Sequence, residues 1–144
     1  NNVRLSFIGE WRLLKPDLVA LLDGAQARTR DNTGLRLVMA LNYGGQDELV
    51  RAARALASDV AAGRLAAAAI DADALAVRLD TADLPPPDAV LRTSGELRLS
   101  NFLLWQSAYA EFLVTDTLWP DFDGDALAAA VAEFARRERR FGGR

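Results

Sequence analysis

Segments with the composition of β-strands alternate along the chain with segments that repeat apolar residues at helical spacing. The strand-like segments are residues 3–8, 35–41, 88–92 and 111–115. Helical patterns follow each of them, and a further short helical pattern precedes the third. Such alternation is typical of parallel sheets whose strands are joined by crossover helices. We therefore predict an α/β fold, a mostly parallel β-sheet flanked by helices, within one domain portion spanning residues 1–144.

Capping and breaking residues indicate where the elements begin and end. Pro16 suits the first turn of a helix, and Gly63 marks the end of the helix that follows Gly45. Asp71 is expected to cap a short helix, and Asp125 to cap the final one. The apolar run over residues 35–41 has the pattern of a strand that is buried on both faces of a parallel sheet.

The composition excludes several kinds of chemistry. The chain of 144 residues contains no Cys and no His. It therefore has no disulfide framework, cysteine nucleophile, Cys/His zinc site, serine–histidine triad or histidine general base. Seventeen basic and twenty acidic residues give a net charge of −3, which argues against a general nucleic-acid binder. No apolar run approaches the length of about 18 residues that a membrane-spanning helix needs.

Two loops are expected at the carboxyl ends of strands, where open parallel sheets bind ligands. One is Asn42-Tyr43-Gly44-Gly45, and the other runs from Arg92 to Ser100. The second loop contains Arg92, Arg98, three hydroxyl side chains and a glycine, and a helical pattern over residues 102–109 follows it. Guanidinium groups, hydroxyls and the N-terminus of that helix would together suit a diphosphate. A turn with Ser100 as N-cap and two surface arginines in ion pairs explains the same residues, so both interpretations stay open.

The second loop also carries a resemblance to a known family. Residues 92–106 read Arg-Thr-Ser-Gly-Glu-Leu-Arg-Leu-Ser-Asn-Phe-Leu-Leu-Trp-Gln, and Ala-Tyr-Ala-Glu follows at residues 108–111. This segment resembles the signature of the cis-prenyltransferases, the undecaprenyl diphosphate synthase family. Residues 42–45, 119–122 and 139–143 fall where that family has similar segments. The resemblance therefore covers essentially the whole chain.

The resemblance implies a reaction and its partners. Members of the family condense isopentenyl diphosphate onto an allylic diphosphate such as farnesyl diphosphate, using Mg²⁺, and produce a long-chain polyprenyl diphosphate with cis double bonds. The fold implied is a parallel sheet with helices around an apolar tunnel. The resemblance also implies a cytoplasmic homodimer. Peripheral contact with a membrane for product release is a further option.

The resemblance also assigns roles to individual residues. Arg92, Arg98 and Ser100 match the positions that hold the isopentenyl diphosphate head group. Glu111 matches the carboxylate associated with Mg²⁺, whereas without this match a charge at a helix–strand junction would be the favoured explanation. Asn42 either shapes its loop or supports the loop beside the substrate. Among the C-terminal arginines, which otherwise form a solvated helix end, Arg140 is the candidate for reaching a diphosphate across the dimer.

The chain departs from the family pattern in two respects. The family's Asp-Gly-Asn-Gly-Arg-Trp-like loop, whose Asp is the main catalytic residue, is absent, and we expect it before Asn1. The chain then corresponds to the C-terminal portion of the enzyme, and these residues alone are expected to be inactive. In addition, Gln46 stands where many relatives have Arg. The alternative functions are a non-catalytic cis-prenyltransferase-like subunit and a diphosphate-binding module.

Overall fold

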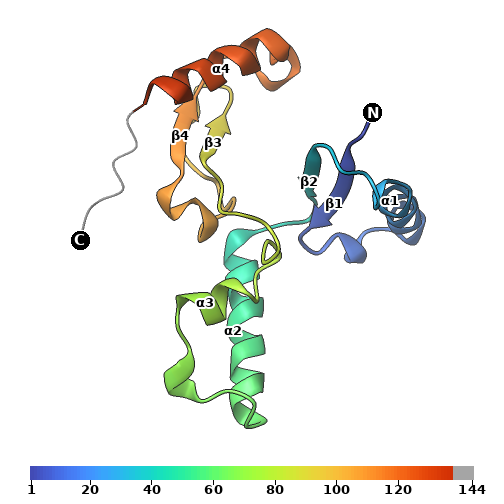
Figure 1. Ribbon diagram of the computed structural model, residues 1–144, viewed down its shortest axis with the longest axis vertical. Helices are drawn as coiled ribbons and strands as arrows, with labels where there is room; N and C mark the ends of the chain where they lie inside the picture. Colours follow the sequence, from blue (N-terminus) through green and yellow to red (C-terminus); the bar gives the residue numbers. More distant parts are fainter. Residues whose placement is uncertain (138–144) are drawn as a thin grey trace. The chain divides into compact units, whose positions relative to one another are not determined.

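The computed structural model describes residues 1–137, and the chain divides into two compact units, Asn1–Leu84 and Pro85–Arg144. Each unit contains one pair of parallel strands with a helix packed against it (Figure 1). The parallel strands and flanking helices confirm the predicted α/β class. The extent of the domain and the apolar tunnel stay predictions.

The first unit is built on β1 (Arg4–Ile8) and β2 (Arg36–Ala40). These strands pair in parallel, with Arg4 opposite Arg36 and Ile8 opposite Ala40. Helix α1 (Pro16–Thr29) makes the crossover between them and packs against β1. Pro16 occupies the first turn of α1 as predicted, because its fixed φ and missing N–H are tolerated there.

Helix α2 (Gly45–Ala61) follows β2, and α3 (Ala72–Ala76) packs against α2. Glu48, Ala52 and Leu56 recur every four residues and form the buried face of α2. The apolar core of this unit also contains the side chains of Phe7, Ile8, Trp11 and Leu79. Two of the sequence predictions are confirmed here. Gly63 adopts a left-handed φ of 69° just beyond α2, and the Asp71 carboxylate caps α3 by accepting from the Ala74 N–H at 2.8 Å.

The second unit is built on β3 (Ala89–Arg92) and β4 (Glu111–Val114). These strands are also parallel, with Ala89 opposite Glu111 and Arg92 opposite Val114. Helix α4 (Gly124–Arg136) packs against β4. Within the described residues, each unit thus contributes one pair of parallel strands.

Burial of β2 on both faces was predicted wrongly. Leu37 is 46% exposed, Met39 is 42% exposed, and no residue of β2 is buried. The physical reason is that, among the described residues of the first unit, β2 pairs only with β1, and α1 packs against β1.

The α-helix expected over residues 102–109 does not form. A 3₁₀-helix at Gln106–Tyr109 is the only helical element between β3 and β4 in the described structure. Ser100, Asn101 and Leu103 have φ angles of 49°, 64° and 45°. Left-handed residues cannot continue a right-handed helix, so Ser100 is not an N-cap. The interpretation that a helix N-terminus contributes to an anion site here is therefore wrong.

The cap of the final helix is also corrected. Asp123, rather than Asp125, accepts a hydrogen bond from the Ala126 N–H at 2.9 Å. Asp125 lies inside the first turn of α4, where its charge complements the helix dipole. Among the described residues, none of the helices has the length and apolar character to cross a membrane.

Candidate functional site

The loop after β3 begins with a tight turn held by backbone hydrogen bonds to the segment after β4. The N–H groups of Ser94 and Gly95 donate to the carbonyls of Thr117 and Thr115, each at 3.0 Å. Ser94 and Gly95 both have a left-handed φ, of 64° and 65°. The ladder between β3 and β4 thus continues into the loop and fixes the direction in which it leaves Arg92.

Glycine at position 95 satisfies two requirements of this turn. The left-handed φ strains any residue with a Cβ. A Cβ at Gly95 would also lie 3.0 Å from Oδ1 of Asp116. Glycine therefore lets the turn stay close to the segment after β4 without backbone strain and without a shift of the Asp116 side chain.

The three residues matched to the isopentenyl diphosphate head group have different environments. Arg92 ends β3 and is partly buried, whereas Ser100 is exposed. Arg98 forms an ion pair with Glu96, and its side chain is 68% exposed. No hydrogen bond or ion pair joins these three side chains to one another in the described part of the chain. The structure places them on one segment but does not gather them into a formed site.

Glu111 lies at the opposite end of the strand pair from Arg92. It is paired with Ala89 at the start of β3, and its N–H donates to the Asp88 carbonyl at 3.0 Å. Glu111 and Arg92 are three residue positions apart along the strand pair, a distance of about 10 Å. The structure therefore does not bring the Glu111 backbone near that of Arg92.

The Glu111 carboxylate is held by a cation from the end of α4. Arg137 Nη1 lies 3.3 Å from Glu111 Oε2 and donates to the Phe112 carbonyl at 3.0 Å. Arg137 also forms an ion pair with Glu133 at 2.5 Å. The hydrogen bond to Glu133 and then that to Glu111 raise the pKa of Arg137 above its ordinary value. Glu111 thus has a structural partner within this chain.

Asn42 joins the loops that follow β1 and β2. Its Nδ2 donates to the Glu10 carbonyl at 3.1 Å, and its own carbonyl accepts from the Glu10 N–H at 3.0 Å. Asn42 adopts a left-handed φ of 49°, which asparagine tolerates better than most residues. This geometry confirms that Asn42 shapes its loop, and its support of a substrate loop stays a prediction.

A hydrogen-bonded network beneath this loop was missed by the sequence analysis. Glu48 is 1% exposed and accepts from the Tyr43 hydroxyl at 2.6 Å and the Asp80 N–H at 2.8 Å. The Asp80 carboxylate accepts in turn from the Gly9 N–H at 2.8 Å and from Arg51 at 2.7 Å. Glu48 shares its helical face with Ala52 and Leu56, and that spacing was the available signal of its burial.

Arg51 completes the network by pairing with two carboxylates. Its Nε lies 3.2 Å from Glu10, and its Nη2 lies 2.7 Å from Asp80. Burial by itself would lower the pKa of Arg51. The hydrogen bond to Asp80 and the negative charges of Asp80, Glu10 and Glu48 outweigh burial, so the pKa is raised. These charges stabilise the carboxyl ends of β1 and β2.

Two points of the sequence analysis remain, the role of Arg140 and the ligands of Mg²⁺. Arg140 lies outside the described residues. Within residues 1–137, no group of three or more acidic side chains is arranged to hold a metal ion. Mg²⁺ is commonly bound by one or two carboxylates together with substrate phosphates. Glu111 fits that mode as a single carboxylate ligand, and the chain holds no closed metal site in its described part.

Comparison with known proteins identifies the family. A sequence model of the family described as "Putative undecaprenyl diphosphate synthase" matches residues 1–142. The chain belongs to the undecaprenyl diphosphate synthase family. The "Isoprenyl transferase" of Brucella suis biovar 1 is 57% identical over 143 residues, which are 99% of this chain and 56% of that protein. This member of the undecaprenyl diphosphate synthase family thus spans a little over half the length of that relative.

Solved structures agree with the assignment to the undecaprenyl diphosphate synthase family. The lavandulyl diphosphate synthase of Lavandula x intermedia, solved in complex with dimethylallyl diphosphate, has a TM-score of 0.95 and 36% identity, covering 98% of this chain and 61% of that one. A probable undecaprenyl diphosphate synthase of Campylobacter jejuni has a TM-score of 0.82 and 35% identity, covering 99% and 64%. The fold of this chain is therefore that of the family.

Proposed function

We propose that the protein containing this chain condenses isopentenyl diphosphate with an allylic diphosphate, such as farnesyl diphosphate, to form a long-chain polyprenyl diphosphate. One observation supports this most strongly: 57% identity to an isoprenyl transferase over 99% of the chain. The complete Arg-Thr-Ser-Gly-Glu segment at residues 92–96 also favours an active enzyme over a non-catalytic subunit or a diphosphate-binding module.

Arg92, Arg98 and Ser100 are the proposed ligands of the isopentenyl diphosphate head group. A planar guanidinium presents two N–H donors to phosphate oxygens, and a hydroxyl adds a third direction. Arg98 must then exchange its partner Glu96 for the diphosphate. Because Arg98 is 68% exposed, that ion pair is worth little, and the exchange costs little free energy.

Glu111 is the proposed carboxylate ligand that this chain offers to Mg²⁺. When bound, Mg²⁺ supplies charge neutralisation of the diphosphates. Arg137 orients Glu111 from one side through its contact with Oε2. The role of Arg137 is therefore to position the carboxylate.

The proposed reaction is an ionic alkyl transfer. The allylic carbon–oxygen bond breaks, and its electron pair leaves on the diphosphate oxygen. The terminal alkene carbon of isopentenyl diphosphate bonds to the allylic carbon, and loss of a proton from C2 forms the new double bond. Positioning and charge stabilisation can supply such catalysis without the Cys or His nucleophiles that this chain lacks. A homodimer, a diphosphate contact from Arg140 and peripheral membrane contact belong to the same proposal.

The test is turnover by the full natural protein with isopentenyl diphosphate, farnesyl diphosphate and Mg²⁺. Products lengthened by successive isopentenyl units, with cis double bonds in their NMR spectra, would support the proposal. Binding of isopentenyl diphosphate without any product would instead assign the protein to the diphosphate-binding modules. Products with trans double bonds would contradict the proposed stereochemistry.

A further inference from the structure

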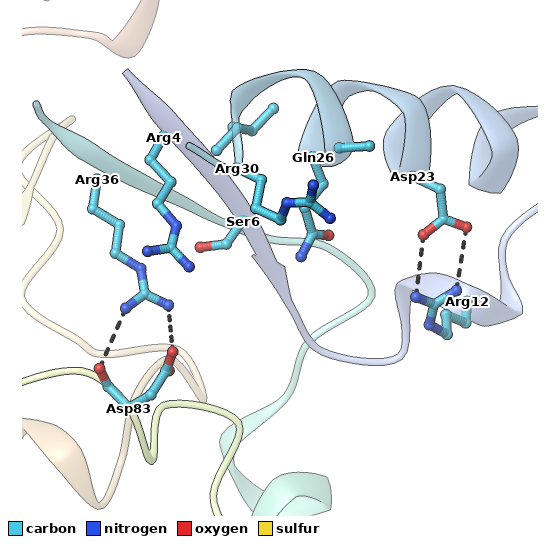
Figure 2. Close-up of a pocket in the computed structure, with 10 residues that line it drawn as sticks. Arg4, Ser6, Arg12, Asp23, Gln26, Arg30, Arg36 and Asp83 are labelled. Atoms are coloured by element: carbon cyan, nitrogen blue, oxygen red, sulfur yellow. Dashed lines mark hydrogen bonds and ion pairs between the residues drawn. The ribbon is translucent and has the colours of Figure 1, made fainter. Parts of the chain in front are cut away.

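A cavity in the first unit is lined by none of the residues that the sequence analysis assigned to a site. Its volume is about 380 Å³, and Figure 2 shows it between α1 and the strands β1 and β2. Arg4 and Arg36, which are partners across the two strands, place it toward the amino ends of β1 and β2. The Asn42 loop, by contrast, follows the carboxyl end of β2.

The charge of this cavity is unbalanced. Four arginines line it, Arg4, Arg12, Arg30 and Arg36, against two acidic residues, Asp23 and Asp83. Both carboxylates already have partners: Arg12 binds Asp23 at 3.1 Å, and Arg36 binds Asp83 at 2.6 Å (Figure 2). Two guanidinium groups therefore remain without a hydrogen bond or ion pair to an acidic residue that lines the cavity, and one of them, Arg4, acts on Asp83 only through its charge.

Those two guanidinium groups belong to Arg4 and Arg30. Within residues 1–137, the Arg4 side chain makes no hydrogen bond or ion pair. Arg30 has one ion pair, at 3.6 Å to Asp31, whose side chain is 90% exposed and does not line the cavity. Such an exposed pair contributes little and leaves the Arg30 donors available.

Two polar atoms of residues that line the cavity are buried and lack a hydrogen-bond partner in the described structure. Ser6 Oγ and Arg36 Nε are both inaccessible to solvent and have no hydrogen-bond partner in the described structure. Both residues line the cavity, and the Ser6 hydroxyl points toward the Arg4 guanidinium in Figure 2. Buried donors without partners are rare because each one loses its hydrogen bonds to water. Because solvent does not reach these two atoms, a ligand in the cavity would be held by the accessible donors around them.

The donors on this wall define the chemistry of the ligand. Arg4 and Arg30 each present a planar fork, and the side-chain amide of Gln26 adds a donor from another direction. A tetrahedral oxyanion accepts from several directions at once, and guanidinium forks match its oxygens in pairs. We propose that this cavity is a binding site for a phosphate dianion, either inorganic phosphate or the phosphate group of a small monoester.

The test maps the reactivity of individual arginines in the full natural protein. Phenylglyoxal modifies accessible arginines, and mass spectrometry measures the extent at each one. Inorganic phosphate should protect Arg4 and Arg30 from phenylglyoxal. Arg54, which lies on α2 outside the cavity, should keep its reactivity. A parallel reaction with sodium chloride at equal ionic strength controls for the screening of charges by salt. Glycerol 1-phosphate in place of phosphate distinguishes the two sources, since stronger protection by the ester favours a phosphomonoester and equal or weaker protection favours the free ion.

A variant gives the second readout without relying on catalytic activity. In Arg4→Ala, the phosphate concentration that half-protects Arg30 should rise about ten- to hundredfold, because one charge-assisted hydrogen-bonding partner is lost. Arg54→Ala should leave that concentration unchanged. Equal modification of Arg4 and Arg30 with and without phosphate would overturn the proposal. So would arginines that resist phenylglyoxal before any phosphate is added, because another part of the protein would then fill the cavity.

Discussion

The Tyr43 hydroxyl donates a hydrogen bond of 2.6 Å to Glu48, a carboxylate that is only 1% exposed. The other carboxylate oxygen of Glu48 accepts from the Asp80 N–H at 2.8 Å. One buried acid therefore connects the loop after β2 with the segment after α3. The position of Asn42, which precedes Tyr43, depends on this connection.

Substitution of Glu48 should therefore destabilise the fold. Glu48→Ala leaves the Asp80 N–H buried without an acceptor, and we expect a loss of about 3 kcal/mol in the free energy of unfolding. Glu48→Gln keeps one acceptor oxygen and should cost about 1–2 kcal/mol. Chemical denaturation of the full natural protein measures both values. Arg54→Ala, on the same helix but exposed, is the control and should stay within about 0.5 kcal/mol.

Substitutions of Gly63 and Gly9 should measure separately the free-energy costs of backbone strain and of steric crowding. Gly63 has a φ of 69° and no atom within 4 Å of a Cβ position, so Gly63→Ala should cost about 1 kcal/mol through strain alone. Gly9 has a φ of 90°, and its Cβ would lie 2.5 Å from the Leu41 carbonyl oxygen and 2.8 Å from Tyr43 Cβ. Gly9→Ala should cost about 2–4 kcal/mol, because backbone of the next loop must move. Equal losses in the two variants would show that the crowding at Gly9 is relieved freely.

Arg92 and Arg98 should contribute to binding of isopentenyl diphosphate. Replacing either one by Ala removes charge-assisted hydrogen bonds worth about 1.5–3 kcal/mol, so kcat/KM for this substrate should fall about ten- to hundredfold. Arg→Lys keeps the charge but loses the planar fork and should recover only part of the loss. Steady-state kinetics with both substrates, supported by thermal melts, provides the measurement. An equal fall in kcat/KM for the allylic substrate would contradict the assignment of these residues to isopentenyl diphosphate. Unchanged kcat/KM for both substrates would mean that Arg92 and Arg98 have no role in substrate binding.

Glu111 and Arg137 should differ in their effect on Mg²⁺ dependence. If the carboxylate is a metal ligand, Glu111→Gln should lower turnover and raise the Mg²⁺ concentration needed for half-maximal activity. Arg137→Ala breaks the same ion pair, observed at 3.3 Å, but keeps the carboxylate. It should therefore shift the Mg²⁺ titration less. Identical titrations for Glu111→Gln and the unmodified protein would give Glu111 a purely structural role.

The ion pair between Arg36 and Asp83 should make stability depend on pH at the acid end. The hydrogen bond from Arg36 is the main cause that lowers the pKa of Asp83 below its ordinary value of 3.8, against the opposing effect of burial. The stabilisation is therefore present above that ordinary pKa and is lost as the pH falls through the lowered value. Asp83→Asn should make the decline of Tm with falling pH shallower than in the unmodified protein. Asp31→Asn is the control, and a slope unaltered by Asp83→Asn would count against the pair.

Local patterns predicted most of the secondary structure because they report on short-range physics. Alternation of strand and helical segments gave the α/β class, and Asp71 and Pro16 were placed correctly at helix starts. The segment over residues 102–109 was predicted wrongly as a helix, since its apolar spacing does not reveal the left-handed backbone at Ser100, Asn101 and Leu103. Spacing reports which side chains could share a face, but it does not reveal the backbone φ that makes a helix impossible.

For the candidate site, the sequence by itself determined which residues are proposed to carry the chemistry: Arg92, Arg98 and Ser100 in one loop and Glu111 beyond it. These are properties of residue type and order, which a family motif preserves. Only the tertiary structure decided that Glu111 pairs with Arg137, that Glu48 is buried under Tyr43, and that Arg4 and Arg30 line one cavity. Each of these pairings joins residues through packing and hydrogen bonds in three dimensions. No local pattern specifies them, because they depend on which faces of the helices and strands meet when the chain folds.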